Sequence, residues 1–280
     1  MIPIQYLLRF IEEDVPAGDI TSETVIPDIA CTAYIKSEQE GIIAGLEEAT
    51  RLFSHFGVRV TPGARDGNMV KRGDLLLTLD GPGREILLVE RTALNIIGRM
   101  SGIATRTRIL ADLVYSVNPS CQIAGTRKTS PGCRRLDKKA IILGGGDPHR
   151  YSLSDGILIK DNHLALTTVT DAIRNAKMAS SYKKIEVEVE TCEDALIAAR
   201  AGADIIMLDN MNPDAIHATL AAISQEGLRD RVVIEISGGI DETRLKEYAV
   251  LDINVISMGA LTHTVKNFSV TLEIVPVKKQ

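Results

Sequence analysis

Short apolar runs alternate with amphipathic stretches through the second half of the chain. The runs predicted to be strands cover residues 122–126, 156–161, 184–190, 204–210, 232–239 and 254–260. Between most of them apolar residues recur at intervals of three and four, which predicts helices over residues 168–179, 193–202, 213–224 and 241–250. Strands that alternate with single helices in this way predict a parallel β/α architecture with right-handed crossovers.

Residues typical of helix ends lie at the predicted boundaries. Thr191 and Asp241 occupy N-cap positions, and Asn212 precedes a proline in the first turn. Gly202 ends a helix just before the next strand. Two arrangements of these units stay open, a doubly wound sheet and a short barrel. The barrel is favoured because no G-x-G-x-x-G follows the first strand and nearly every strand ends in a polar residue or glycine.

The first hundred residues lack this rhythm. We expect an opening helix over 3–14, a strand and turn over 32–45, hairpin structure over 66–83 and a long helix from about Ile86 to Val114. The apolar run at 269–275 looks like a strand with no helix after it, which would let it return to the N-terminal sheet. The chain is therefore expected to hold two domains.

Composition indicates a globular protein with aliphatic layers. Of the 280 residues 45% are hydrophobic, only 4% are aromatic and none is Trp. The four cysteines are widely spaced without a C-x-x-C pair, so neither a disulfide framework nor a structural zinc site is indicated. No N-terminal signal pattern and no apolar run near the ~20 residues of a membrane span are present, and we expect a cytoplasmic protein.

Positive charge is concentrated in one segment of an acidic chain. The net charge is −5, yet residues 125–150 hold seven Lys and Arg against two Asp. This asymmetry suits the capture of a small, highly charged anion, whereas nucleic-acid and membrane surfaces need a general basic excess. Arg134, Arg135 and Lys138 either join that site or form a solvated helix face.

The predicted strand ends carry a chemical constellation, since they converge on one mouth of a β/α barrel. The residues at these ends are Arg127, Lys128, Lys160, Glu188, Asp209, Ser237, Gly238 and Gly259. The carboxylates of Glu188 and Asp209 suit a magnesium ion, or else they neutralise Lys128 or Lys160. The glycine-bearing ends suit a phosphate seat, or are glycines for conformational reasons alone.

Three glutamates alternate along one strand and so face one side of it. If Glu186, Glu188 and Glu190 point into the lumen, they require cations there, because unpaired buried carboxylates are costly. His149 and Arg150 follow a glycine run, and His163 lies just past Lys160.

The motifs, in this order, resemble those of the quinolinate phosphoribosyltransferase family, also called nicotinate-nucleotide pyrophosphorylase (carboxylating). The strings that carry the resemblance are "GDITSE" (18–23), "ERTALNIIGRMSGIAT" (90–105), "TRKTSPG" (126–132), "GGGDPHR" (144–150), "LIKDNH" (158–163), "EVEVE" (186–190), "IIMLDN" (205–210), "ISGGI" (236–240) and "MGALTH" (258–263). They span nearly the whole chain.

The resemblance implies the type II phosphoribosyltransferase fold. It consists of an N-terminal α/β sandwich, here 1–108 with 266–280 returning to it, and an incomplete seven-stranded parallel β/α barrel, here 109–265. The implied enzyme is a pentosyltransferase that joins quinolinate to phosphoribosyl pyrophosphate with Mg²⁺, yielding nicotinate mononucleotide, pyrophosphate and CO₂. A head-to-tail homodimer, or an oligomer of such dimers, is also implied.

The resemblance also implies roles for particular residues. The quinolinate pocket is lined by Thr126, Arg127, His149, Arg150 and Lys160, with Arg91 from a partner subunit. Lys128 faces the phosphoribosyl donor, and Glu188 and Asp209 position magnesium and the ribose. The 5′-phosphate seat is formed by Ser237, Gly238 and Gly259, with His263 beside it. Lys128, Lys160, Glu188 and Asp209 form the implied catalytic set.

Two departures from the common bacterial pattern keep alternatives open. Gly125 stands where an aspartate is usual, and Asp147-Pro148 replaces an apolar-asparagine pair. A nicotinate-using phosphoribosyltransferase is therefore an alternative. A molybdenum-transport-associated relative, which resembles this chain in "TRKT" and the glycine triplet, is another on the same fold, although the intact "KDNH" with Lys160 and His163 argues against it. A Schiff-base aldolase using Lys160, and a barrel that binds without chemistry, are alternatives of other classes.

Overall fold

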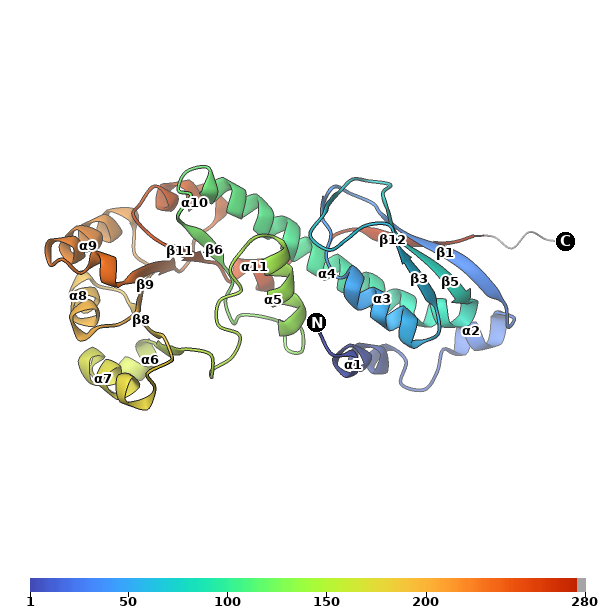
Figure 1. Ribbon diagram of the computed structural model, residues 1–280, viewed down its shortest axis with the longest axis horizontal. Coiled ribbons are helices and arrows are strands. Elements are labelled where there is room, and N and C mark those ends of the chain that lie inside the picture. The colour runs from blue at the N-terminus through green and yellow to red at the C-terminus, as the bar shows by residue number, and fades with distance from the viewer. Residues whose placement is uncertain (276–280) are drawn as a thin grey trace. The chain divides into compact units, whose positions relative to one another are not determined.

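The computed structural model describes residues 1–275 as two compact units (Figure 1). Unit 1 comprises Met1–Arg108, Ser130–Gly145 and the chain from Thr264 onward, and unit 2 comprises Ile109–Thr129 and Gly146–His263. Residues 276–280, which were expected to return to the first domain, lie outside the described residues.

Unit 1 is built on an antiparallel four-stranded sheet of order β12-β1-β5-β3. Its strands are β1 (Ala30–Ser37), β3 (Arg59–Pro62), β5 (Leu75–Pro82) and β12 (Val270–Ile274). The strand expected over 269–275 is β12, which pairs antiparallel with β1 and aligns Leu272 with Ile35. Ile35 and Leu77, partners across β1 and β5, are fully buried in the core of this unit.

The hairpin predicted over 66–83 is wrong. β4 (Met69–Val70) pairs with β2 (Gly41–Ile42), while β5 pairs with β1 and β3. The Asp74 carboxylate accepts from the Lys71 backbone N–H at 2.8 Å and closes the intervening turn. The apolar run in β5 has buried residues on both faces, which a two-stranded hairpin cannot provide.

The helices of unit 1 are α1 (Ile4–Asp14), α2 (Ile20–Val25), α3 (Leu46–His55), α5 (Arg134–Leu143) and the first part of α4 (Gly83–Tyr115). Sequence reasoning placed α5 within the barrel range, but the structure groups it with unit 1. Leu136 and Ile141 join the core of this unit, and Arg99 of α4 binds Asp137 with Nε–Oδ1 and Nη2–Oδ2 distances of 2.7 and 2.9 Å.

Unit 2 contains a parallel six-stranded sheet of order β6-β11-β10-β9-β8-β7. Its strands are β6 (Gln122–Ala124), β7 (Ile157–Ile159), β8 (Ile185–Val189), β9 (Ile205–Asp209), β10 (Val233–Ser237) and β11 (Val255–Ser257). The first strand pairs with the last, which is the closure of a barrel rather than a doubly wound sheet. Asp147 forms an isolated parallel bridge with Ala124 of β6 and so occupies the place of a seventh strand. No pairing joins Asp147 to β7 within residues 1–275, and the barrel is incomplete there.

Helices lie outside the strands of unit 2 in Figure 1. They are α6 (Asp161–Leu164), α7 (Val169–Ala179), α8 (Cys192–Ala201), α9 (Pro213–Gln225), α10 (Glu242–Ala249) and α11 (Ala260–His263), with a 3₁₀ turn at Arg229–Arg231. The predicted caps are confirmed, because Thr191, Asn212 and Asp241 each accept a backbone N–H three residues on. Gly202 ends α8 with φ 82°.

Alternate strand residues separate the two faces of the barrel wall. Val187, Ile206 and Ile234 belong to the hydrophobic core that packs against the helices. The residues between them point to the other face, where the charged positions of the sequence lie. The fold thus places chemistry inside the barrel and apolar packing outside it.

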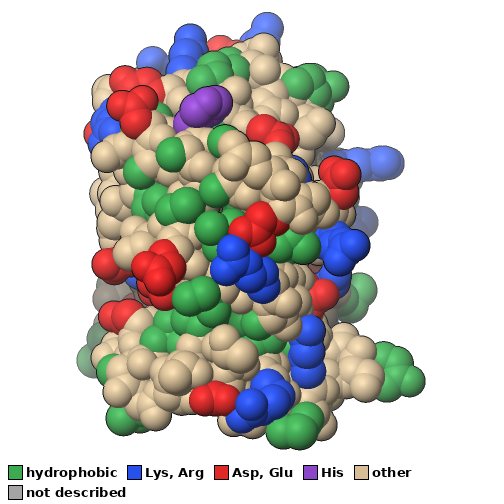
Figure 2. Space-filling view, turned by 90° about the vertical axis from the view of Figure 1, so that its left-hand side faces the viewer, with side chains coloured by type: hydrophobic (Ala, Val, Ile, Leu, Met, Phe, Trp, Pro, Cys, Tyr) green, Lys and Arg blue, Asp and Glu red, His purple; other side chains and the backbone are tan. Residues whose placement is uncertain are grey.

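Basic and acidic side chains are interspersed over the face that carries α8 and α9 (Figure 2). This mixture agrees with the net charge of −5 and does not resemble a polyanion-binding surface. Within residues 1–275 no helix is both long and apolar enough to cross a membrane.

Gly102→Ala should destabilise unit 1, because a Cβ at this position of α4 would lie 2.3 Å from the carbonyl oxygen of Lys266. We expect a loss of about 1–2 kcal/mol in the free energy of unfolding, as overpacking outweighs the gain in helix propensity. Urea denaturation followed by circular dichroism measures it. Gly98→Ala, where the Cβ would meet Phe268 at 3.0 Å, is the matched control and should cost less. Equal stability of Gly102→Ala and the unsubstituted protein would contradict the close approach.

Candidate active site

A cavity of about 370 Å³ occupies the mouth of the barrel in unit 2. The residues that line it are Thr126, Arg127, Lys128, His149, Arg150, Leu158, Lys160, Glu188, Met207, Asp209, Glu235, Ser237 and Ser257. Most residues proposed from the sequence are therefore brought together in one place.

Four of the proposed site residues are not part of this lining, namely Arg91, Gly238, Gly259 and His263. Gly238 follows Ser237 directly, and Gly259 lies against Lys128 and His263, at 3.0 and 3.1 Å from the position of a Cβ. Arg91 lies on an exposed face of α4 in unit 1. Arg134, Arg135 and Lys138 also lie outside the lining, on or at the start of α5, where Lys138 is buried.

The lining includes four residues that sequence reasoning missed, namely Leu158, Met207, Glu235 and Ser257. Each precedes a residue at a predicted strand end by two positions. Because strand side chains alternate, a residue two places earlier faces the same lumen one layer deeper. The alternation of strand side chains was therefore the sequence signal that could have identified these four residues.

Arg127 and Arg150 line one side of the cavity, where acidic groups such as Glu186 and Glu188 offset the charge of Arg150 only in part. Nε of Arg127 is buried and has no hydrogen-bond partner among residues 1–275. Burial, followed by the charge of Arg127, lowers the pKa of the Arg150 guanidinium. A bound anion would relieve both effects, so this side is suited to carboxylates or phosphates.

Lys160 links this cationic side to the carboxylates. It is the N-cap of α6, and its backbone N–H donates to Nδ1 of His163 at 2.9 Å. Its Nζ forms an ion pair with Glu188. His163 therefore has a local structural role, and the lumen cation required by Glu188 is Lys160.

Asp209 and Glu188 form an acidic pair at neighbouring strand ends. Burial and the charge of Glu188 raise the pKa of Asp209. The Asn210 amide donates to Asp209 Oδ2 at 2.6 Å. A divalent cation would offset the repulsion between the two carboxylates, and their oxygen donors fit Mg²⁺.

The turn after β10 requires glycine. Gly238 has φ 91°, and a Cβ there would lie 2.7 Å from the backbone nitrogen of Asn210. The following N-cap, Asp241, starts α10. Backbone amides can approach a ligand closely at such a turn, which suits a phosphate.

His149 and two buried glutamates lie deeper in the lumen. Nε2 of His149 is 3.2 Å from Glu235 Oε2 and 3.7 Å from Glu186 Oε2. Burial and the neighbouring Glu235 carboxylate raise the pKa of Glu186 to about 7. Glu190, by contrast, is exposed, so only two of the three alternating glutamates required a lumen cation.

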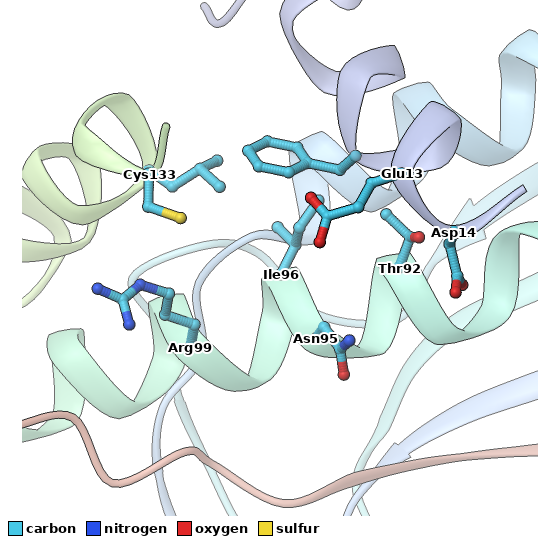
Figure 3. Close-up of a pocket in the computed structure, with 9 residues that line it drawn as sticks. Glu13, Asp14, Thr92, Asn95, Ile96, Arg99 and Cys133 are labelled. Atoms are coloured by element: carbon cyan, nitrogen blue, oxygen red, sulfur yellow. The ribbon is translucent and has the colours of Figure 1, made fainter. Parts of the chain in front are cut away.

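A second cavity, of about 260 Å³, lies in unit 1 between α1, α4 and α5 (Figure 3). Arg99 and Cys133 lie toward one end, and Glu13 and Asp14 lie toward the other. Arg99 is already bound by Asp137 through two hydrogen bonds, and burial raises the pKa of the Cys133 thiol, which disfavours the reactive thiolate. The barrel cavity is therefore the better candidate active site.

Known proteins match this chain over nearly its full length. The quinolinate phosphoribosyl transferase N-terminal and C-terminal domain profiles match residues 19–101 and 103–273. The chain belongs to the quinolinate phosphoribosyl transferase family.

Individual members of that family are similar throughout. A probable nicotinate-nucleotide pyrophosphorylase [carboxylating] of Methanothermobacter thermautotrophicus is 43% identical, over 95% of this chain and 96% of its own. A nicotinate-nucleotide pyrophosphorylase [carboxylating] of Rattus norvegicus is 32% identical over 95% of this chain and 88% of its own. The structure of the nicotinate-nucleotide pyrophosphorylase from Francisella tularensis superimposes with a TM-score of 0.90 at 33% identity, covering 98% of each chain. These neighbours agree with the expected type II phosphoribosyltransferase fold.

Glu186→Gln should change the pH dependence of stability. The pKa of Glu186 is about 7 in the folded protein against an ordinary 4.5, so the folded state retains a proton that the unfolded chain releases across this range. Stability should therefore fall as pH rises through the window, by up to about 3 kcal/mol. Chemical denaturation near pH 5 and pH 8 should show a smaller fall for Glu186→Gln. Glu190→Gln, at the exposed end of the same strand, should behave like the unsubstituted protein; identical behaviour of both variants would contradict the raised pKa.

Proposed function

We propose that this protein transfers the phosphoribosyl group of phosphoribosyl pyrophosphate to the ring nitrogen of quinolinate, with release of pyrophosphate and CO₂. The product is nicotinate mononucleotide, a precursor of NAD. The observation that carries the proposal is one cavity, in a member of this family, that sets Arg127, Arg150 and Lys160 against Glu188 and Asp209.

The cationic side fits the two carboxylates of quinolinate. Guanidinium groups bind planar carboxylates through two parallel hydrogen bonds, which a lysine cannot do. We assign this task to Arg127 and Arg150, with Lys160, His149 and Thr126 completing the pocket. The same charges select against the uncharged amide of nicotinamide.

The acidic side fits the phosphoribosyl donor. We assign Glu188 and Asp209 to the ribose and to Mg²⁺, which when bound would stabilise the departing pyrophosphate. Lys128 faces the donor phosphates. The turn at Ser237 and Gly238 is proposed to bind the 5′-phosphate.

The 5′-phosphate seat is completed by residues near the start of α11. We propose that Gly259 and His263 contribute here, since the side chains of Lys128 and His263 both lie against Gly259. All three belong to unit 2, so the seat is formed by a single unit.

The proposed reaction requires no general base. The bond between ribose C1′ and pyrophosphate breaks, positive character develops on the ribose, and the nearby carboxylates stabilise it. The bond from C1′ to the ring nitrogen then forms. The resulting pyridinium accepts the electron pair released when the 2-carboxylate leaves as CO₂, and the ring carbon takes up a proton.

Arg91 is proposed to complete the quinolinate pocket of a partner subunit. It lies on an exposed face of α4 and is not among the residues that line the cavity. This assignment implies a head-to-tail homodimer. We place the reaction in the cytoplasm.

Use of nicotinate is the second candidate, and one observation favours testing it. The two positions that depart from the common pattern are neighbours, since the Gly125 backbone N–H donates to the Asp147 carbonyl at 2.9 Å. They lie directly before Thr126 and His149 of the proposed pocket, so both departures bear on the same substrate contacts. The Schiff-base alternative is disfavoured, because Nζ of Lys160 is engaged in an ion pair with Glu188.

Incubation with quinolinate, phosphoribosyl pyrophosphate and Mg²⁺ should release CO₂ and nicotinate mononucleotide in equal amounts. Chelation of the metal should abolish turnover, and added Mg²⁺ should restore it. Nicotinate in place of quinolinate is the matched control and should react far more slowly. If the protein uses nicotinate in preference to quinolinate, the proposed substrate is wrong. If borohydride traps an adduct on Lys160, the proposed class of reaction is wrong.

Arg127→Ala and Asp209→Ala should affect different substrates. Arg127→Ala should raise KM for quinolinate by about 30-fold, because a charged hydrogen-bonded pair is lost. Asp209→Ala should mainly impair use of phosphoribosyl pyrophosphate and weaken the response to Mg²⁺. Steady-state kinetics with each substrate varied in turn measures both effects, with Arg174→Ala on the surface of α7 as the control. If Arg127→Ala impairs use of phosphoribosyl pyrophosphate and Asp209→Ala impairs quinolinate binding, the assignment of the two sides of the cavity is wrong.

A further inference from the structure

His149 is fixed to the barrel by its backbone. Its φ is 56°, a region that residues other than glycine adopt rarely, and its N–H donates to Asp147 Oδ1 at 2.5 Å. Asp147 is itself tied to the barrel, since its N–H donates to the carbonyl of Ile123 at 2.8 Å. With the backbone fixed, the contacts of the imidazole decide where the ring points.

Glu235 is a hydrogen-bond partner of that imidazole. Its Oε2 lies 3.2 Å from Nε2 of His149, and its side chain is 2% exposed. A carboxylate accepts and does not donate, so Nε2 carries the proton and donates it. Glu186 lies 3.7 Å away and is 5% exposed, which makes it an electrostatic neighbour rather than a hydrogen-bond partner.

The glutamates depend on His149 in turn. Each keeps its Oε1 buried without a hydrogen-bond partner among residues 1–275. The bond from His149 is the hydrogen bond that the Glu235 side chain makes within the described chain. A buried carboxylate without any donor is costly, so the contact is favoured from both sides.

The carboxylates support His149 from within the barrel. A cavity of about 300 Å³ lies next to the active site, among residues near the strand starts such as Ile157 and Val233. His149 and Glu235 line both cavities, whereas Glu186 lines only this second one. His149 and Glu235 therefore both face the active-site cavity, and Glu186 lines only the neighbouring one.

We propose that Glu235 is a positioning residue for quinolinate binding that acts through His149. By accepting a hydrogen bond from Nε2–H it holds the ring in one orientation and one tautomer before substrate binds. A group that is already oriented loses less conformational entropy on binding. The inference rests on the proposed function, because it takes the oriented imidazole of His149 to bind quinolinate.

The same three side chains offer a different reading as a metal site. His149, Glu186 and Glu235 each present one ligand atom, and these atoms lie within 4.8 Å of one another. Arg150 and Lys160 also act electrostatically on Glu186, so an added metal ion would meet cations already facing the carboxylates. Positioning is therefore the role we argue, and zinc binding is an outcome of the test.

Kinetics of the full chain test the proposal. Glu235→Ala should raise KM for quinolinate by about tenfold, the lower end expected for a supporting hydrogen-bond partner, and leave KM for phosphoribosyl pyrophosphate unchanged. Glu235→Gln keeps a carbonyl acceptor and should recover most of the loss. Glu48→Gln, an equally buried carboxylate in unit 1 at 1% exposure, is the control and should leave both constants unchanged. Equal rises in both constants, or no rise, would overturn the proposal.

A double-mutant cycle tests whether Glu235 acts through His149. Adding Glu235→Ala to His149→Asn should cause little further loss, because the group being positioned is already absent. If the losses caused by Glu235→Ala and His149→Asn instead multiply in the double variant, the positioning role is overturned. Binding of one zinc ion per chain that Glu235→Ala abolishes, measured by calorimetry with zinc chloride, would also overturn it.

A spectroscopic readout separates this inference from the proposed function. Nitrogen-15 NMR of the ligand-free protein should show a protonated Nε2 on His149, and Glu235→Ala should produce a mixture of tautomers. If the unsubstituted protein gives this signal but makes no nicotinate mononucleotide, the proposed function fails while the hydrogen bond stands. If turnover is normal but the Nε2 signal is indifferent to Glu235, the positioning role fails and the function stands.

Discussion

Balance of buried charge across the barrel lumen is the constraint on which the rest of this structure depends. Short parallel strands give one face to the helices and the other to the lumen, and here the lumen face carries ionised side chains. Each buried carboxylate must meet a cation or a hydrogen-bond donor, or folding would be opposed. Glu188 meets Lys160, and Glu235 meets His149.

The same balance makes the site responsive to ligands. Nε of Arg127 has no hydrogen-bond partner among residues 1–275, and nearby carboxylates offset the charge of Arg150 only in part. Asp209 is repelled by Glu188. In the proposed reaction the two carboxylates of quinolinate would pair with the arginines, and a divalent cation would offset the repulsion between Asp209 and Glu188. Under this proposal, substrate and metal would bind in a cavity whose charges are already separated, a form of preorganisation that stabilises developing charge.

Much of the fold was predictable because its signals are local. The caps at Thr191, Asn212 and Asp241 depend on residues within three positions of one another, and all three form as expected. The failures involve partners distant in the chain. β5 pairs with β1 and β3 rather than with β4, and α5 packs in unit 1 although it follows the first barrel strand. No local pattern reports which distant surface will bury an apolar run.

The sequence by itself determined the barrel class and the charged strand ends at Lys160, Glu188 and Asp209, since strand periodicity and end residues can be read without knowing the partners. Only the tertiary structure decided that Glu235 lies under His149, separated from it by 86 positions. That contact depends on strand order and on ring closure, because two residues so distant in sequence become neighbours only when every intervening unit has taken its place. The packing of the strands, rather than the types of the two residues, brought His149 and Glu235 into contact.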